Sequence, residues 1–202
     1  MQLGYMVSEN AKVEFSKDGN KLYFGTAPVR SPKDTMLVDF ELSKVDVWSY
    51  KDDYLQTQQL KNQETELKRS YVAVYHINSN KLVQLGAEDA ENISIVNEGN
   101  AGWVLAESNK GNRVESQWTG RTKSSAYVIN SYTGERKTIF TNLYLNAEAS
   151  PGGNFVYWYN PVLKNYFTYE VATGITKNIS EKIKVPLYDE ETTCRICPEV
   201  MV

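Results

Sequence analysis

The side chains with the most obvious chemistry are one histidine and two cysteines. His76 lies within the apolar run Val72–Ile77, and Cys194 and Cys197 lie near the end of the 202-residue chain. A serine hydrolase needs a nucleophile, a histidine base and an orienting carboxylate, and the sequence has no Gly-x-Ser-x-Gly motif. A structural zinc ion needs four ligands, which two thiols and one distant histidine do not supply. We therefore expect a structural His76, an incidental cysteine pair, and no catalytic, cofactor-binding or metal-binding residue.

Carboxylates could act in pairs as general acid and base, and two pairs are adjacent in the sequence. They are Asp52 with Asp53, and Glu88 with Asp89. A catalytic pair needs a set separation and unequal environments, and neighbours on a polar loop have neither. We expect solvated loop acids at these positions. The sequence also has no Gly-x-Gly-x-x-Gly motif and no P-loop, so nothing in it indicates a nucleotide site.

Aromatic residues make up 12% of the chain and include 14 Tyr and 4 Trp. Trp48 and the run Tyr157–Tyr159 could stack on a sugar or hold a peptide. Aromatic side chains more often bury their large apolar area, so we expect these residues to fill interfaces between sheets. The same aromatic richness favours strands.

Charge and hydropathy argue against two classes of function. The net charge is −3 and no cluster of Lys and Arg could neutralise phosphates, so we expect no nucleic-acid partner. No segment approaches the roughly 18 consecutive apolar residues of a membrane helix, so we expect no membrane partner. The first fifteen residues lack the basic region and apolar stretch of a signal peptide and resemble the interior of a domain. The localisation of this chain therefore stays unknown.

Two kinds of hairpin recur along the chain. Residues 15–24 (FSKDGNKLYF) and 149–158 (ASPGGNFVYW) each place Ser before a glycine turn and an apolar run. Residues 127–140 and 167–179 each turn at a Thr-Gly pair, and residues 74–85 form a weaker copy. Repeats of roughly 40–50 residues made of short strands and turns are typical of propeller blades.

Turn signals spaced about 8–12 residues apart predict about fifteen short strands. Besides the hairpins, we expect strands at residues 36–38, 45–50, 93–96, 103–106, 114–118 and 145–149. Residues 51–70 are rich in Gln, Glu and Lys with a thin stripe of leucines, which fits either a helix or an extended connection. We expect a solvated connector there in preference to a lid or an interface segment.

The fold class that follows is all-β. We expect a partial β-propeller of roughly four WD40-like or dipeptidyl-peptidase-like blades with short antiparallel strands, extending over residues 1–190. Residues 191–202 break the pattern and contain both cysteines. They are expected to form an irregular tail, native or introduced, outside the fold.

The sequence resembles the propeller domain of prolyl-oligopeptidase-type serine peptidases, the dipeptidyl-peptidase and acylaminoacyl-peptidase relatives, particularly large bacterial ones. The likeness covers about residues 10–190 and is carried by four segments. These are the blade openings 15–24 and 149–158, the segment VDVWSYKDD at 45–53, and RSYVAVYH at 69–76 with LVQL at 82–85, which looks like the following blade.

The resemblance implies a parent enzyme in which a propeller caps an α/β-hydrolase domain and restricts entry to short peptides. This chain holds neither that domain nor its catalytic residues. We therefore expect a non-catalytic segment that gates peptide access and belongs to a periplasmic or exported parent. The implied partners are a peptide substrate, the missing hydrolase domain and the remaining blades, with self-association through open strand edges. Two alternatives stay open: a stand-alone propeller that binds a protein, peptide or glycan, and a glycosidase-like propeller.

Overall fold

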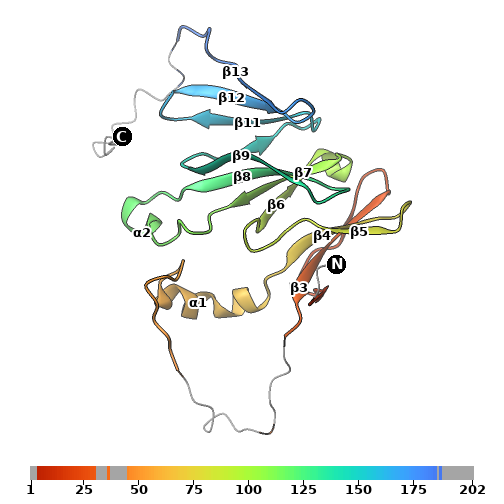
Figure 1. Cartoon of the computed structure of the whole chain (residues 1–202), viewed down its shortest axis with the longest axis vertical. Helices are drawn as coiled ribbons and strands as arrows, with labels where there is room; N and C mark the ends of the chain where they lie inside the picture. The colour runs from red at the N-terminus through yellow and green to blue at the C-terminus, as the bar shows by residue number, and fades with distance from the viewer. Residues whose placement is uncertain (1–3, 31–35, 37–44, 186, 188–202) are drawn as a thin grey trace.

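The computed structural model describes residues 4–30, 36, 45–185 and 187. Within them, short antiparallel strands form three sheets that follow one another along the chain and lie side by side (Figure 1). In each sheet, most strands that are consecutive in the sequence pair with each other. This succession of meander sheets is the architecture of propeller blades and confirms the prediction of a partial all-β propeller.

Blade 1 is the most irregular of the three sheets. Its strands are β1 (Tyr5–Val7), β2 (Glu14–Phe15), β3 (Lys21–Pro28), β4 (Tyr71–His76) and β5 (Lys81–Gln84). Both β1 and β2 pair with β3, β2 near its start at Leu22 and β1 near its end at Thr26. The two short strands therefore act as one interrupted edge strand, and the blade keeps the order of a four-stranded sheet.

Blades 2 and 3 are regular four-stranded meanders. Blade 2 contains β6 (Asn92–Ile95), β7 (Trp103–Ser108), β8 (Ser124–Asn130) and β9 (Arg136–Leu143). Blade 3 contains β10 (Glu148–Ala149), β11 (Phe155–Asn160), β12 (Asn165–Glu170) and β13 (Ile175–Asn178). The recurring hairpins are confirmed at their turns, where Gly134 and Gly174 have φ of 77° and 73°, a left-handed conformation that glycine adopts without steric cost.

The described residues hold three blades, where the sequence predicted roughly four. The difference arises in blade 1. Residues 12–26 and 71–85, expected as parts of successive blades, share one sheet, because β3 pairs with β4 from Lys21 opposite His76 to Thr26 opposite Tyr71. The long segment between them is an insertion within this blade.

Two strand predictions were wrong. Residues 45–50 alternate like a strand but form none, and all six are exposed, so neither set of side chains has a sheet to pack on. Residues 114–118 were expected in a strand, but α2 (Ser116–Thr119) is a helical turn that ends at Gly120 with φ of 67°. Of the strand expected at 36–38, residues 37 and 38 lie outside the described residues, as does the whole tail 191–202.

The segment that fitted either a helix or an extended connection is a helix, α1 (Gln56–Leu67). It contains no buried residue and links β3 to β4, as expected for a solvated connector. Its polar sequence leaves it without an apolar side to bury, so contacts at its ends must fix its position.

Two hydrophobic cores lie between the blades. The first joins blade 1 to blade 2, and its members include Tyr23, Val74, Leu85, Val104, Ala106 and Ile129. The second joins blade 2 to blade 3, and its members include Trp103, Leu105, Phe140, Val156, Trp158 and Tyr169. Alternation along each strand places one set of side chains toward the preceding blade and the other toward the following blade.

A buried lysine completes the first interface. Lys21 is only 2% exposed, and its Nζ donates hydrogen bonds to the backbone carbonyls of Gly99 (3.1 Å), Asn100 (3.2 Å) and Ala101 (2.5 Å) in blade 2. The hydroxyl of Tyr23 donates to the same Gly99 carbonyl at 3.0 Å. Burial lowers the pKa of Lys21 and raises the pKa of Tyr23 to about 12.

Candidate functional site

Several connections leave the three blades at the same end of the sheets. Because neighbouring strands are antiparallel, the β3–β4, β5–β6, β7–β8, β9–β10 and β11–β12 connections all emerge there. We call this end the connection face. It carries the insertion of blade 1 with α1, and the β7–β8 connection with α2 (Figure 1). In folds of this kind, binding residues concentrate on such loops, so this is where a site is expected.

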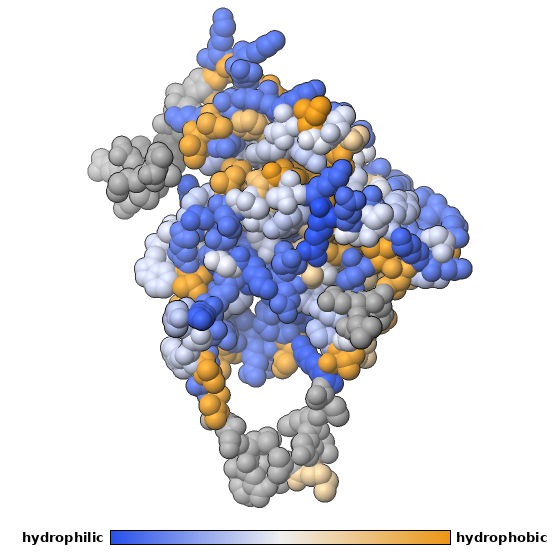
Figure 2. Space-filling view, in the orientation of Figure 1, coloured by the Kyte–Doolittle hydropathy of each residue, from blue (hydrophilic) through white to orange (hydrophobic). Residues whose placement is uncertain are grey.

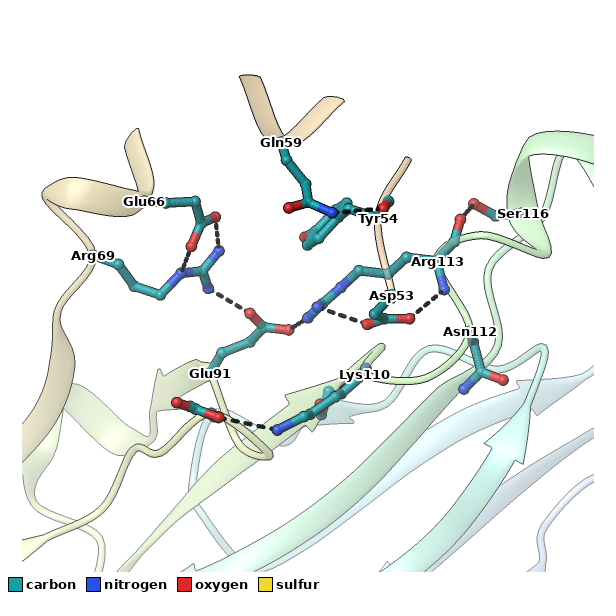
Figure 3. A network of polar contacts seen from close by, with 12 residues as sticks. Asp53, Tyr54, Gln59, Glu66, Arg69, Glu91, Lys110, Asn112, Arg113 and Ser116 are labelled. Carbon is teal, nitrogen blue, oxygen red and sulfur yellow. Dashed lines mark hydrogen bonds and ion pairs between the residues drawn. The ribbon is translucent and has the colours of Figure 1, made fainter. Parts of the chain in front are cut away.

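The insertion is held to the connection face by a chain of ion pairs (Figure 3). Arg69, just after α1, forms ion pairs with Glu66 of the helix and with Glu91 before β6. Glu91 also pairs with Arg113 in the β7–β8 connection. Arg113 in turn donates from its Nη1 to Asp53, before α1, at 2.8 Å. This chain of ion pairs therefore ties both ends of the helical segment to the blades.

The central charges of this ion-pair chain are shielded from water. The side chains of Glu91, Arg113 and Asp53 are 10%, 15% and 22% exposed. The Arg113 guanidinium also lies over the Tyr54 ring, with Cζ 4.6 Å from the ring centroid. Ion pairs with this degree of burial are screened less than surface pairs, so each link holds the insertion more firmly than an exposed bridge would. The hydrogen bonds from Arg69 lower the pKa of Glu66 and keep its carboxylate ionised.

The adjacent acids do not act as pairs. Asp53 belongs to the ion-pair chain, so the expectation of a solvated acid was wrong there, since the arginine that covers it is 60 residues further along the sequence. Asp52 accepts a hydrogen bond from Gln59 within the insertion at 3.0 Å. Glu88 pairs with Lys110 at 3.1 Å, and Asp89 pairs with Arg136 at 2.8 Å, which lowers the pKa of Asp89.

His76 has a structural setting between blades 1 and 2. The side chain is 4% exposed, and Nε2 lies 2.8 Å from the Ser131 carbonyl. Because a carbonyl oxygen only accepts, Nε2 carries the proton of this hydrogen bond. The imidazole also stacks on Tyr132, with ring centroids 4.4 Å apart. Every polar contact of the imidazole that the structure shows thus links the two blades.

The aromatic candidates separate into two groups. Trp158 is 7% exposed and packs between Phe140 of blade 2 and Phe167, as the sequence predicted for a residue that fills an interface. Trp48 does not fill a blade interface, since it is 70% exposed. It lines a cleft of about 250 Å³ beside the start of α1, together with Tyr50, Tyr54, Leu55 and Val114. The predicted role failed because residues 45–50 lie outside the sheets.

A second hollow lies on the connection face between blades 2 and 3. One part has a volume of about 420 Å³ and is lined by Arg121, Asn109, Tyr144 and Asn146. The adjoining part has a volume of about 340 Å³ and an aromatic lining that includes Trp158. These hollows are open to solvent and offer polar and aromatic groups but no catalytic constellation of nucleophile and base.

The described residues contain neither a cluster of metal ligands nor a membrane-spanning helix. Among residues 4–30, 36, 45–185 and 187, no three His, Cys, Asp or Glu side chains gather as metal ligands. The cysteine pair, Cys194 and Cys197, lies outside this set. No helix in the described part is long and apolar enough to span a membrane.

Comparisons with known proteins give distant structural likenesses only. No family model and no curated protein matches the sequence. TolB from Acinetobacter baumannii is 12% identical with a TM-score of 0.36, over 84% of this chain and 32% of that protein. A putative TolB from Agrobacterium tumefaciens is 12% identical with a TM-score of 0.35, over 85% of this chain and 49% of that protein.

A prolyl endopeptidase is 8% identical with a TM-score of 0.38, over 87% of this chain and 22% of the endopeptidase. The chain thus spans less than half the length of each of these three proteins. At such identities and TM-scores the likenesses assign neither a family nor an activity to this chain.

Proposed function

We propose that this chain is a non-catalytic β-propeller segment of a prolyl-oligopeptidase-type serine peptidase, and that it gates the access of peptides to a hydrolase domain outside this sequence. The peptidase part of the proposal comes from the sequence resemblance of residues 10–190. The gating part is carried by one observation, the anchoring of the blade 1 insertion on the connection face by the ion-pair chain.

The physical argument concerns how an insertion can control an opening. α1 contributes no buried side chain, so its position depends on polar contacts at its two ends, through Asp53 and Arg69. An element fixed in this way can move aside when those contacts break, without unfolding a core. Loops that open and close on such hinges commonly control entry to a buried reaction site.

The test uses the intact gene product and compares two neighbouring acids. Asp53→Asn removes the charge that pairs with Arg113 and so frees one end of the insertion. Asp52→Asn is the matched control, because the Asp52 carboxylate accepts its hydrogen bond from Gln59, which belongs to the insertion itself. For Asp53→Asn we expect kcat/KM for long peptides to rise severalfold relative to a dipeptide-sized substrate, and for Asp52→Asn no change in this ratio.

Two results would contradict the proposal. If the intact gene product cleaves no peptide, the peptidase assignment fails, and a stand-alone propeller that binds a protein, peptide or glycan becomes the better account. If peptides are cleaved but Asp53→Asn leaves the ratio at the wild-type value, the insertion is not a gate.

A further inference from the structure

Blade 3 has one face packed on blade 2 and one face without a covering sheet among the described residues. Val156 pairs with Tyr169 and Trp158 with Phe167, and these side chains contribute to the second core. The alternate side chains of the same strands point to the other side and form the free face of blade 3. Its apolar and aromatic members are Phe155, Tyr157, Tyr159, Tyr166, Ile175 and Ile179. Four of its members are 40% to 58% exposed. Figure 2 shows apolar residues on the outside of this uppermost blade.

The internal repeat identifies what this face corresponds to. When the blade openings 15–24 and 149–158 are superposed in sequence, Lys21 falls on Phe155 and Tyr23 falls on Tyr157. In blade 1 these two positions are each 2% exposed, because blade 2 covers them. In blade 2, Trp103 at the start of β7 likewise points toward the following blade, and it is 8% exposed because blade 3 covers it. The free face is the third member of a series whose first two members are buried by the next blade.

The hydrogen bonds of the series follow the same rule. Lys21 donates to the carbonyls of the first turn of the following blade, and Trp103 Nε1 donates to the Gly153 carbonyl at 2.8 Å. Tyr23 likewise donates to the Gly99 carbonyl. Tyr157, its counterpart, instead donates to the Glu148 carboxylate of its own blade at 2.5 Å. The donor that would reach a following turn is therefore present but turned to a neighbouring strand.

We propose that the free face of blade 3 docks a fourth antiparallel blade, whose first turn places a main-chain carbonyl on the Tyr157 hydroxyl. The inference rests on the propeller-segment part of the proposed function and is independent of gating. It requires a blade with an apolar docking side, as blade 2 presents Val104 to blade 1 and blade 3 presents Val156 and Trp158 to blade 2. Glu170 and Lys177 share the free face, so a polar rim on the partner fits and a lipid surface does not.

Hydroxyl-radical footprinting of the 202-residue chain and of the intact gene product tests this docking. Phe155 and Tyr166 are expected to react readily in the short chain and severalfold more slowly in the intact protein. Tyr132, which is 49% exposed at the junction of blades 1 and 2, is the internal reference and should react equally in both. Equal rates for Phe155 and Tyr166 in the two proteins would overturn the proposal. If these residues react equally in the two proteins but become protected in the short chain with rising concentration, the face binds a second copy of the chain and the proposal fails.

A pair of substitutions tests the hydrogen bond itself. Tyr157→Phe should lower the melting temperature of the intact protein by about 2–4 °C and leave the short chain unchanged, because the contact with Glu148 is exposed. Tyr75→Phe, which removes an exposed hydrogen bond to Asn80 within blade 1, should change neither. A loss for Tyr157→Phe no larger than for Tyr75→Phe would refute the hydrogen bond. Neither measurement uses peptidase activity, so failure of the gating proposal leaves both interpretable.

Discussion

Lys21→Met is the substitution that best tests how the blades are held together. The methionine keeps the length of the side chain and removes the ammonium group that three backbone carbonyls accept from. Of those three acceptors, the Gly99 carbonyl keeps its bond from Tyr23, and the Asn100 carbonyl lies in a partly buried bond that water can replace. The Ala101 carbonyl is buried and loses the donor that lies 2.5 Å away.

The expected loss follows from that one carbonyl. Leaving a buried acceptor without a donor costs about 1–3 kcal/mol. The variant also removes the cost of burying a charge, which offsets part of the loss of the charged hydrogen bonds. We expect a net decrease of about 2 kcal/mol in the free energy of unfolding, and hence a melting temperature lower by about 4–8 °C for a chain of this size.

The assay is urea denaturation followed by tryptophan fluorescence, with Lys81→Met as the control. Lys81 also donates to a blade 2 carbonyl, that of Tyr132 at 2.6 Å, but it does so in an exposed position. The control should therefore lose less than about 0.5 kcal/mol. Equal losses in the two variants, or a more stable Lys21→Met, would refute the argument that the buried ammonium joins blades 1 and 2.

The pH dependence of this effect has a definite sign. Burial lowers the pKa of Lys21 below its ordinary value of 10.5, so the unfolded chain binds more protons than the folded chain between the two values. Wild-type stability therefore gains from this group as pH rises through the folded pKa toward 10.5. The stability difference between wild type and Lys21→Met should widen over that range, and a difference that narrows would contradict the assignment.

Two further substitutions test the packing of the blades. Burial raises the pKa of Glu107, so its carboxylate costs stability above the raised pKa, and this cost disappears as the pH falls through that value. Glu107→Gln keeps the acceptor for the Ala147 N–H. In urea titrations this variant should be more stable than wild type at pH 7.5 and equally stable near pH 4.5. Gly99→Ala should lose about 2–3 kcal/mol by thermal denaturation, since its φ is 84° and a Cβ would lie 2.9 Å from the Ser16 Cα. Gly19→Ala is its control, with a φ of 71° and open space, and should lose only about 1 kcal/mol; equal losses would show that the contact between blades is not tight.

Local signals in the sequence were sufficient for the hairpins of blades 2 and 3. Glycine turns such as Gly134 and Gly174 have a physical requirement that only a few residue types satisfy, so their spacing predicts hairpins reliably. The alternation at residues 45–50 shows the limit of this approach. A strand also needs a neighbouring strand to pair with. Residues 45–50 have no such neighbour among the described residues, and the local sequence pattern does not reveal this.

The candidate site was harder to predict because its contacts are distant in sequence. Asp53 resembles any solvated loop acid until the fold places Arg113 against it. Lys21 resembles any polar residue in a hairpin until the turn of the next blade supplies three carbonyls. Charged residues that become buried through such partners carry no local pattern, whereas apolar alternation does.

The insertion in blade 1 has a consequence for the order in which the chain folds. Strands β11 and β12 are joined by residues 161–164, and β7 and β8 by the longer connection 109–123, whereas β3 and β4 meet only after residues 29–70 have been looped out. Closing a loop of that length costs about 2 kcal/mol more in chain entropy than closing a four-residue turn. Pairings between residues distant in sequence slow folding, so we expect blades 2 and 3 to form early and the pairing of β3 with β4 to form last. Refolding followed by pulsed hydrogen exchange should then protect the amides of β8 and β12 before those of β4.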